Sequence, residues 1–282
     1  ELVVQLEEHT AHLRFRGGGE EPGERSYEDA RYCSAIFRQS PLAVAREGRR
    51  LVPLAALFSR RCDGGPRLWG DFWQQHGIRD GRAWFSHYAG VVVRAQLGLL
   101  LRYGLSLEAH GQNTCLEFQE DGSLGRLICQ ELGGGAFWDP ERLAALPAVD
   151  FRREVYARDD ILEPFDKCVA VVRHTMLRLH LLPLAGEAAA FFELAEADLR
   201  RAVESTVRGA PGSAWAAQWA EDTLPADAYS RYAAAAVDGL LRPSGALKAL
   251  LRMRLMQTKG EIYVEESCGG PAGRDGVAPA AA

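Results

Sequence analysis

The chain lacks several features that would assign it to a common class of protein. Its six cysteines, at positions 33, 62, 115, 129, 168 and 268, form no C-x-x-C pair and no Cys/His cluster with zinc spacing. It contains no G-x-S-x-G nucleophile motif and no internal repeat, which argues against a serine hydrolase and a solenoid. No secretory hydrophobic region opens it, so we expect reduced thiols in a cytoplasmic protein.

Charge and hydropathy narrow the class of partner. The 33 basic and 38 acidic residues give a net charge of -5, which disfavours a nucleic-acid partner. The most apolar segment, residues 83–103, is interrupted by Ser86, His87, Arg94 and Gln96. It is therefore predicted to be a core helix, and no membrane association is expected. The first residue is Glu1 rather than Met, so we expect this chain to be part of a longer polypeptide.

A long buried helix is predicted over residues 82–103, where apolar residues cover nearly the whole circumference. Gly104 is a natural C-cap for it. If residues 105–112 then form a strand, alternation places Ser106, Glu108, His110 and Gln112 on one face. An acid, an imidazole and an amide in one row form either a polar network or a site.

Further elements follow on both sides of this row. Residues 114–119 and 124–131 are predicted to pair as an antiparallel hairpin around Asp121-Gly122, and a glycine triplet follows at 133–135. Helices are predicted at 28–37, at 53–61, at 244–258 and through most of the chain after residue 160. One of these carries the stripe Phe165, Val169, Val172, Met176 and Leu179 and is expected to end near Pro183. His174 and His180 in that helix are expected to be packing or surface residues, and residues 268–282 a disordered tail.

The central segment is also where the chain resembles a known family. "GLSLEAHGQNTCLEF", followed by "RLICQELGG", resembles the nucleotide-binding signature of the IucA/IucC (aerobactin-synthase-like) siderophore synthetases, which work without peptide-synthetase modules. The family pattern is E-A-H-x-Q-N followed by a strand ending R-D-F-G-G. Glu108, His110, Gln112 and Asn113 match it position by position, whereas Gln130 and Glu131 replace the usual Arg and Asp. Weaker similarity includes "AIFRQSP" around Arg38 and "SGALKALLRMRL" near the end.

The resemblance implies an ATP-dependent ligase that adenylates a citrate or dicarboxylate carboxyl group and condenses it with an amine or hydroxyl. It implies that Glu108 and Glu131 help to hold Mg²⁺, a hard ion that suits carboxylate oxygens. His110 would face the reacting carboxylate and the α-phosphate as the catalytic residue, and Glu108, His110, Gln112 and Asn113 would bind nucleotide. Arg38 is a candidate substrate-binding residue.

The same resemblance predicts the architecture. We expect an α+β fold, mostly helical, in which a small antiparallel sheet carries the nucleotide site. Residues 1–267 would form the C-terminal palm-like half of a synthetase, through which family members commonly form homodimers. The partners implied are small carboxylate and amine or hydroxylamine substrates and the upstream half of the same polypeptide. Because the family's triphosphate-gripping residues lie further upstream, the isolated chain is expected to be incomplete as an enzyme.

Two alternatives remain from the same residues. The departures at Gln130 and Glu131 favour a half that binds nucleotide or a partner without catalysis. The sequence "HGQN…DG…ELGG" is also similar to the pattern of aminoglycoside-type phosphotransferases, but those need a catalytic aspartate where Gln112 stands. A ferric-siderophore reductase with an iron-sulfur centre would need clustered cysteines, and only Cys268 lies near the C-terminus.

Overall fold

A computed structural model shows how these segments are arranged. It describes residues 2–4, 7–12, 34–62, 64–65, 67–130, 136–144, 163–216, 224–242, 244–248 and 263–267. The predicted tail at 268–282 and the glycines at 133–135 lie outside these ranges. Within them the fold is α+β and mostly helical, with small sheets that are largely antiparallel, which confirms the predicted class.

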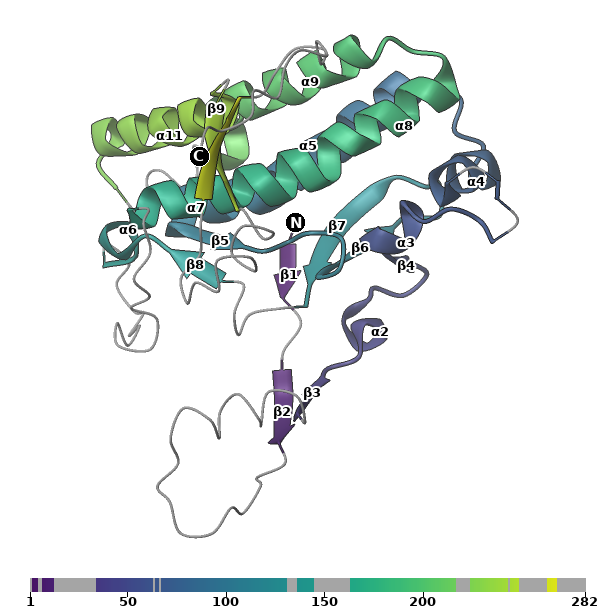
Figure 1. The fold of residues 1–282 in the computed structure, drawn as a ribbon, viewed down its shortest axis with the longest axis horizontal. Coiled ribbons are helices and arrows are strands. Elements are labelled where there is room, and N and C mark those ends of the chain that lie inside the picture. The colour runs from purple at the N-terminus through teal and green to yellow at the C-terminus, as the bar shows by residue number, and fades with distance from the viewer. Residues whose placement is uncertain are drawn as a thin grey trace, which may run out of the picture.

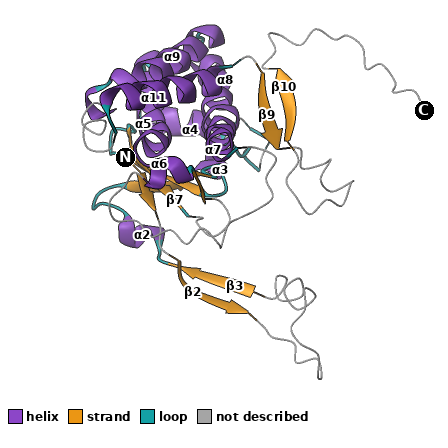
Figure 2. Cartoon of the chain, turned by 90° about the vertical axis from the view of Figure 1, so that its left-hand side faces the viewer, coloured by secondary structure: helices purple, strands orange, loops and turns teal. Residues whose placement is uncertain are grey.

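Most of the helices lie together on one face of a four-stranded sheet, and α2 lies apart from them (Figures 1 and 2). The described strands are β1 Leu2–Val4, β2 Glu7–His12, β3 Ser34–Arg38, β4 Arg50–Pro53, β5 Leu105–Leu107, β6 Thr114–Phe118, β7 Leu124–Cys129, β8 Ala136–Trp138, β9 Ser244–Lys248 and β10 Tyr263–Ser267. The helices before residue 150 are α2 Pro41–Val44, α3 Leu54–Leu57, α4 Leu68–Gln75, α5 Gly81–Tyr103 and α6 Pro140–Ala144. Those after it are α7 Pro164–Val172, η2 Arg173–Leu181, α8 Leu182–Phe192, α9 Glu196–Gly209, η3 Ala210–Gly212 and α11 Ala226–Leu241.

Helix α5 is the central helix that the sequence predicts. Asp80 caps its N-terminus by accepting a hydrogen bond from the Ala83 N–H. Gly104 ends it in the left-handed conformation at φ 65°, and its N–H donates to the Leu100 carbonyl. Most of its side chains are buried, including Gln96, so the helix passes through the core rather than over it. The chain leaves this buried helix directly into β5.

An aromatic cluster packs beside the first half of α5. Trp69 of α4, fully buried, stacks on Trp73 with ring centroids 5.5 Å apart and meets Trp84 of α5 edge-on at 5.7 Å. The ring of Phe118, from β6, packs against Phe72 at 4.5 Å. These rings are packing residues, and they fix α4 and the sheet against α5.

The four-stranded sheet has the order β1-β7-β6-β4. Hairpin β6–β7 is antiparallel, as predicted, and Gly122 takes φ 78° in its turn. β1 pairs in parallel with β7, and β4 pairs antiparallel with β6, so β1 and β4 lie at opposite edges and point the same way. The chain between them must therefore pass from one edge of the sheet to the other.

That connection includes an antiparallel ribbon, β2–β3, which stands away from the helices (Figure 2). The helix predicted at 28–37 is wrong at residues 34–37, which belong to strand β3. The helix predicted at 244–258 is likewise wrong at 244–248, where β9 pairs with β10. In both places the strand has a distant partner in the sequence, and such pairing overrides local helical spacing. The helix predicted at 53–61 is reduced to the four residues of α3.

The helix predicted to end near Pro183 continues from Pro164 to Phe192 through a π-helical segment. At the end of that segment the Leu182 N–H donates to the Leu177 carbonyl, five residues back. Pro183 follows as the second residue of α8, so the proline does not end the helix where the sequence predicted. The wider winding moves the buried face by one residue, so that Leu179 is exposed and His180 is buried.

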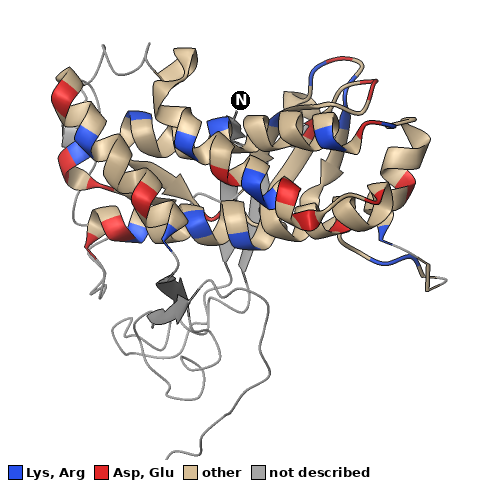
Figure 3. Ribbon diagram, turned by 90° about the horizontal axis from the view of Figure 1, so that it is seen from above, with Lys and Arg blue, Asp and Glu red and all other residues tan. Residues whose placement is uncertain are grey.

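This continuous helix is long and apolar enough to cross a membrane, but 72% of its most apolar 18-residue stretch is buried within the protein. A buried core helix commonly has the same length and composition. Helices α9 and α11 carry charged pairs at i,i+4 spacing, such as Arg208–Glu204 and Arg231–Asp227. Figure 3 shows basic and acidic residues interspersed along the helices.

His180 contacts Tyr88 of α5 in the core, with the phenol oxygen 2.5 Å from Nε2. Both side chains are fully buried, which confirms His180 as a packing residue. Burial disfavours the imidazolium, so the pKa of His180 falls from 6.5 to about 3.

This shift makes stability depend on pH. Between pH 6.5 and about 3 the unfolded chain binds a proton at His180 that the folded chain does not, so stability falls as pH is lowered through that range. The slope for one proton is about 1.4 kcal/mol per pH unit. Urea unfolding at pH 7, 6 and 5 should show a shallower decline for the double variant Tyr88→Phe, His180→Leu than for the parent. Equal slopes would show that His180 is not buried as a neutral ring.

Candidate functional site

The predicted motif lies where two strand pairs meet. β5 pairs antiparallel with β8, with Leu107 opposite Ala136, and β6 pairs with β7, with Thr114 opposite Cys129. The segment 108–113 joins β5 to β6, and the segment 130–135 joins β7 to β8. The end of the first segment, at Asn113, and the start of the second, at Gln130, therefore meet at the junction between the two strand pairs.

The segment 108–113 is a compact turn rather than a continuation of the strand. β5 ends at Leu107, so the predicted strand over residues 105–112 is wrong beyond that residue. The Ala109 and His110 N–H groups donate to carbonyls only two residues back, and the Asn113 N–H donates to the His110 carbonyl at 2.9 Å. A sequence Gly-Gln-Asn supplies typical turn residues, and apolar alternation alone does not reveal them.

Within the turn the side chains alternate as predicted, but Ser106, predicted to lie on the same face as Glu108, is only 1% exposed. Glu108 and His110 are partly exposed and Gln112 is exposed. Ala109 is buried against Leu107 and Cys129. The motif therefore keeps its acid and its imidazole partly accessible and one amide exposed, on a backbone anchored at Ala109.

Gly111 provides a second anchor. Its carbonyl accepts a hydrogen bond from the Ala55 N–H of α3 at 3.1 Å. A Cβ at position 111 would lie 3.3 Å from the Ala55 nitrogen, which is tighter than ordinary contact. The close approach of the α3 backbone explains why this position suits glycine.

Gln130 joins the two segments. Its N–H donates to the Asn113 carbonyl at 2.9 Å, and its side-chain amide donates to Cys115 Sγ at 2.9 Å. Glu131, the predicted second metal ligand, lies outside the described residues. Arg38 is the last residue of β3, whose side chains also lie outside the description. The structure therefore brings together Glu108, His110, Gln112, Asn113 and Gln130, and it does not place the Glu131 or Arg38 side chains.

The cysteines near the junction are buried thiols. Burial raises the pKa of Cys115, and it raises the pKa of Cys129 to about 12. Both thiols are therefore protonated at neutral pH, which makes them poor nucleophiles. Within the described part of the chain, no group of three or more His, Cys, Asp or Glu side chains could hold a metal ion.

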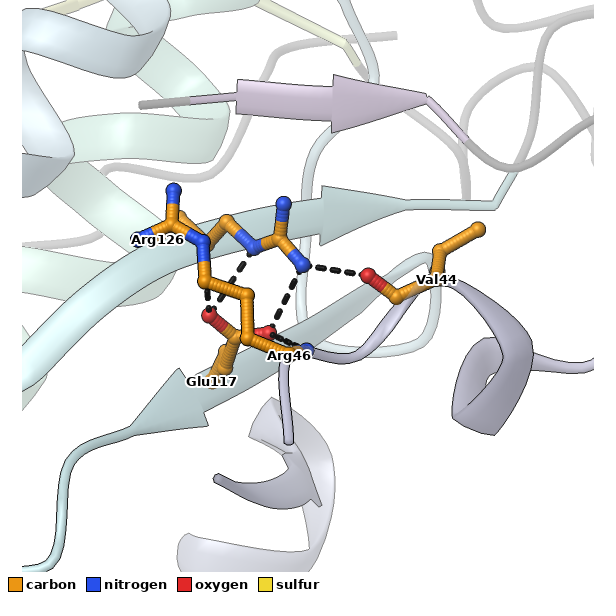
Figure 4. Close-up of polar contacts among 4 residues, drawn as sticks. All are labelled: Val44, Arg46, Glu117 and Arg126. Carbon is orange, nitrogen blue, oxygen red and sulfur yellow. Dashed lines mark hydrogen bonds and ion pairs between the residues drawn. The ribbon is translucent and has the colours of Figure 1, made fainter. Parts of the chain in front are cut away.

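A buried ion pair on the other face of the sheet was not predicted. Glu117 is 1% exposed and accepts hydrogen bonds from Arg126 Nε at 2.9 Å and Arg126 Nη2 at 2.8 Å (Figure 4). The Arg46 N–H donates to the same carboxylate at 2.9 Å, and Arg126 also donates to the Val44 carbonyl. The pair thus binds the connection between β1 and β4 to the two central strands. An Arg and a Glu nine residues apart across a predicted hairpin were the only signal in the sequence.

The other end of β5 is fixed by a second buried cluster. The Asp139 N–H donates to the Gly104 carbonyl at 2.8 Å, and Arg142 Nη2 donates to the Leu101 carbonyl at 3.1 Å. Arg142, 3% exposed, thereby satisfies a terminal carbonyl of α5. Both ends of the short β5 strand are thus held, one by α5 and one by the motif turn.

Comparisons with known proteins show which proteins this chain is similar to in sequence and in fold. A family model described as "Ferric iron reductase FhuF-like transporter" matches residues 82–259, which is more than half of the chain. The chain is 30% identical to the rhizobactin siderophore biosynthesis protein RhbC of Rhizobium meliloti over 98 residues. This aligned stretch covers 33% of this chain and 17% of that protein. The chain is 32% identical to the aerobactin synthase of Vibrio mimicus over 99 residues, an aligned stretch that covers 35% of this chain and 16% of that protein.

The fold is shared with a solved structure, ATP-bound aerobactin synthetase IucA from Klebsiella pneumoniae. The two agree with a TM-score of 0.63 at 19% identity, covering 94% of this chain and 43% of that one. The chain thus spans less than half the length of the proteins that it matches. The resemblance to the IucA/IucC synthetases predicted from residues 108–113 is confirmed by these matches.

Proposed function

Because the chain belongs to the FhuF-like family, whose model spans residues 82–259, we propose that it is the nucleotide-binding portion of an ATP-dependent siderophore synthetase. The observation that carries the proposal is the position of segment 108–113, which meets Gln130 at the junction between the strand pairs β5–β8 and β6–β7. Sequence similarity to RhbC and to an aerobactin synthase connects this chain to siderophore biosynthesis. The ATP-bound state of a protein with the same fold supports the choice of nucleotide.

In this proposal Glu108, His110, Gln112 and Asn113 form the nucleotide side of the site, and His110 is the catalytic residue. The partly exposed Glu108 carboxylate suits Mg²⁺, with Glu131 as the second ligand. The ion would neutralise phosphate charge and so lower the repulsion between ATP and an anionic substrate. Arg38 is retained as a candidate for binding the substrate carboxylate.

The proposed reaction has two steps. A carboxylate oxygen of a citrate-like or dicarboxylic acid attacks the α-phosphorus of ATP, and the bond to pyrophosphate breaks. An amine or hydroxyl group then attacks the acyl carbon, loses its proton and displaces AMP. His110, held on a fixed turn, would donate a hydrogen bond where negative charge develops during the first step.

The remaining parts of the proposal concern the whole polypeptide. The chain would act as residues 1–267 of a C-terminal palm-like half, joined to an upstream half that supplies further cations for the triphosphate. We propose a cytoplasmic homodimer that acts on small molecules and has no nucleic-acid or membrane partner. An inactive nucleotide-binding half is the alternative that the Gln130-Glu131 departure favours.

The products of ATP turnover test the proposal. We expect the complete polypeptide that contains this chain to release AMP and pyrophosphate when given ATP, Mg²⁺, citrate and a hydroxylamine-bearing amine. The 282-residue chain alone should release less than a hundredth as much, since each missing charge-assisted contact is worth about 1.5–3 kcal/mol. Chromatography of the nucleotides gives the answer. ADP with a phosphorylated product would instead indicate a phosphotransferase, and bound but unhydrolysed ATP would indicate the inactive half.

A further inference from the structure

Asn113 is the only asparagine in the 282-residue chain, and its side-chain nitrogen, backbone N–H and carbonyl are all hydrogen-bonded within the fold. Its side-chain Nδ2 donates to the Glu108 carbonyl at 3.2 Å, which closes the turn between its first and last residues. Its backbone N–H donates to the His110 carbonyl, and its own carbonyl accepts from the Gln130 N–H, both at 2.9 Å. One residue thus binds the turn to itself and to the second motif segment.

The neighbouring residues show the contrast. Gln112 carries the same amide group but is exposed, whereas Asn113 is partly buried. Ala109 holds the turn through its buried methyl group, and Gly111 does so through a close backbone contact with α3. Asn113 holds it through its side-chain amide. The side chains at positions 108 and 110 are partly exposed, and the side chain at position 112 is exposed.

We infer that Asn113 is a positioning residue, which fixes Glu108 and His110 for the reaction through its Nδ2 hydrogen bond rather than by contacting the nucleotide through that group. The identity of the reaction in this inference rests on the proposed function, whereas the hydrogen bond itself does not depend on it. An amide suits this position because only its nitrogen end can donate to a carbonyl, and a side chain one methylene shorter than glutamine closes a turn without strain.

The substitution Asn113→Asp separates positioning from ligand contact. Aspartate has the same shape but presents an oxygen to the Glu108 carbonyl, so the turn loses its closing bond and gains a repulsion. A residue that served only as an oxygen ligand for a metal or a ribose would tolerate this change. For the hydrogen-exchange measurement alone, Gln112→Glu is the matched control, because it makes the same chemical change one residue away at an exposed position.

The first measurement needs no ligand. Selective labelling with ¹⁵N-asparagine should give one side-chain NH₂ pair in the NMR spectrum of the full 282-residue chain. We expect one proton of that pair to exchange with solvent at least tenfold more slowly than in a free asparagine amide. We also expect Asn113→Asp to speed hydrogen exchange at the Gln130 N–H by tenfold or more, and Gln112→Glu to leave it unchanged.

The second measurement concerns the reaction. In the complete polypeptide, Asn113→Asp should lower kcat for AMP release by tenfold or more with a smaller change in the KM for ATP. Free exchange of both side-chain protons, or full activity of Asn113→Asp, would overturn the inference. If the parent protein releases no AMP, the proposed function fails. Slow side-chain exchange would then still support the turn-closing role.

Discussion

Replacing Glu117 by alanine should lower the free energy of unfolding by about 3–5 kcal/mol, the usual cost of removing one partner from a buried ion pair. The carboxylate is 1% exposed and accepts three hydrogen bonds, two from Arg126 and one from the Arg46 N–H. Without it the guanidinium of Arg126, only 11% exposed, keeps its charge but loses its counter-ion. Guanidinium cannot escape this cost by losing its proton. Urea unfolding at neutral pH measures the loss.

The surface pair Arg231–Asp227 is the matched control for this experiment. Both of its side chains are about 70% exposed, so Asp227→Ala should cost less than about 1 kcal/mol. The double variant Glu117→Leu, Arg126→Leu should be more stable than Glu117→Ala, because it removes both charges together. If Glu117→Ala costs no more than Asp227→Ala, then the connection between β1 and β4 is not held by this pair.

Replacing His110 by alanine should slow AMP formation in the complete polypeptide by a hundredfold or more, about 3 kcal/mol in transition-state free energy. The turn that carries His110 is anchored at Ala109, Gly111 and Asn113, so the backbone stays in place when the imidazole is removed. Because the His110 side chain is partly exposed rather than buried, the free energy of unfolding of the variant should stay close to that of the parent. Single-turnover AMP release with saturating substrates measures the effect.

His76→Ala provides the comparison. His76 contacts the Glu120 carbonyl at the turn of hairpin β6–β7, whereas the motif lies at the other end of that hairpin. This variant should retain AMP formation within a few-fold of the parent. Near-normal AMP release from His110→Ala would remove the imidazole from the proposed mechanism.

Sequence alone predicts the parts of this fold that rest on local signals. The span of α5, its end at Gly104 and the hairpin around Gly122 each follow from neighbours in the chain. Strands β3 and β9 were predicted as helix because their partners, β2 and β10, are distant or weakly patterned. The π-helical segment was also not predicted, since an extra residue per turn alters no composition and becomes visible only as the burial of His180 in place of Leu179.

The site was predicted in its residues and not in its backbone. Alternation correctly separates the partly exposed Glu108 and His110 from the buried Ala109, but it wrongly groups the buried Ser106 with them. The agreement at residues 108–112 does not come from a strand. A turn anchored at Ala109, Gly111 and Asn113 gives the same alternation of side chains as a strand would. Glu117 and Arg126 were missed because a buried charge has no periodic signature of its own.

The two outer strands of the four-stranded sheet determine the order in which it can assemble. Hairpin β6–β7 joins residues close in sequence, so its closure costs little chain entropy. β1 and β4 can add only once that hairpin offers its two open edges, and β1 must do so across more than a hundred residues. Until both arrive, the newly made hairpin exposes unpaired backbone on either side, the state in which strands of different molecules pair with one another. Refolding yield should therefore fall with protein concentration, and more steeply in Glu117→Ala, where the connection that delivers β4 is no longer held against the central strands.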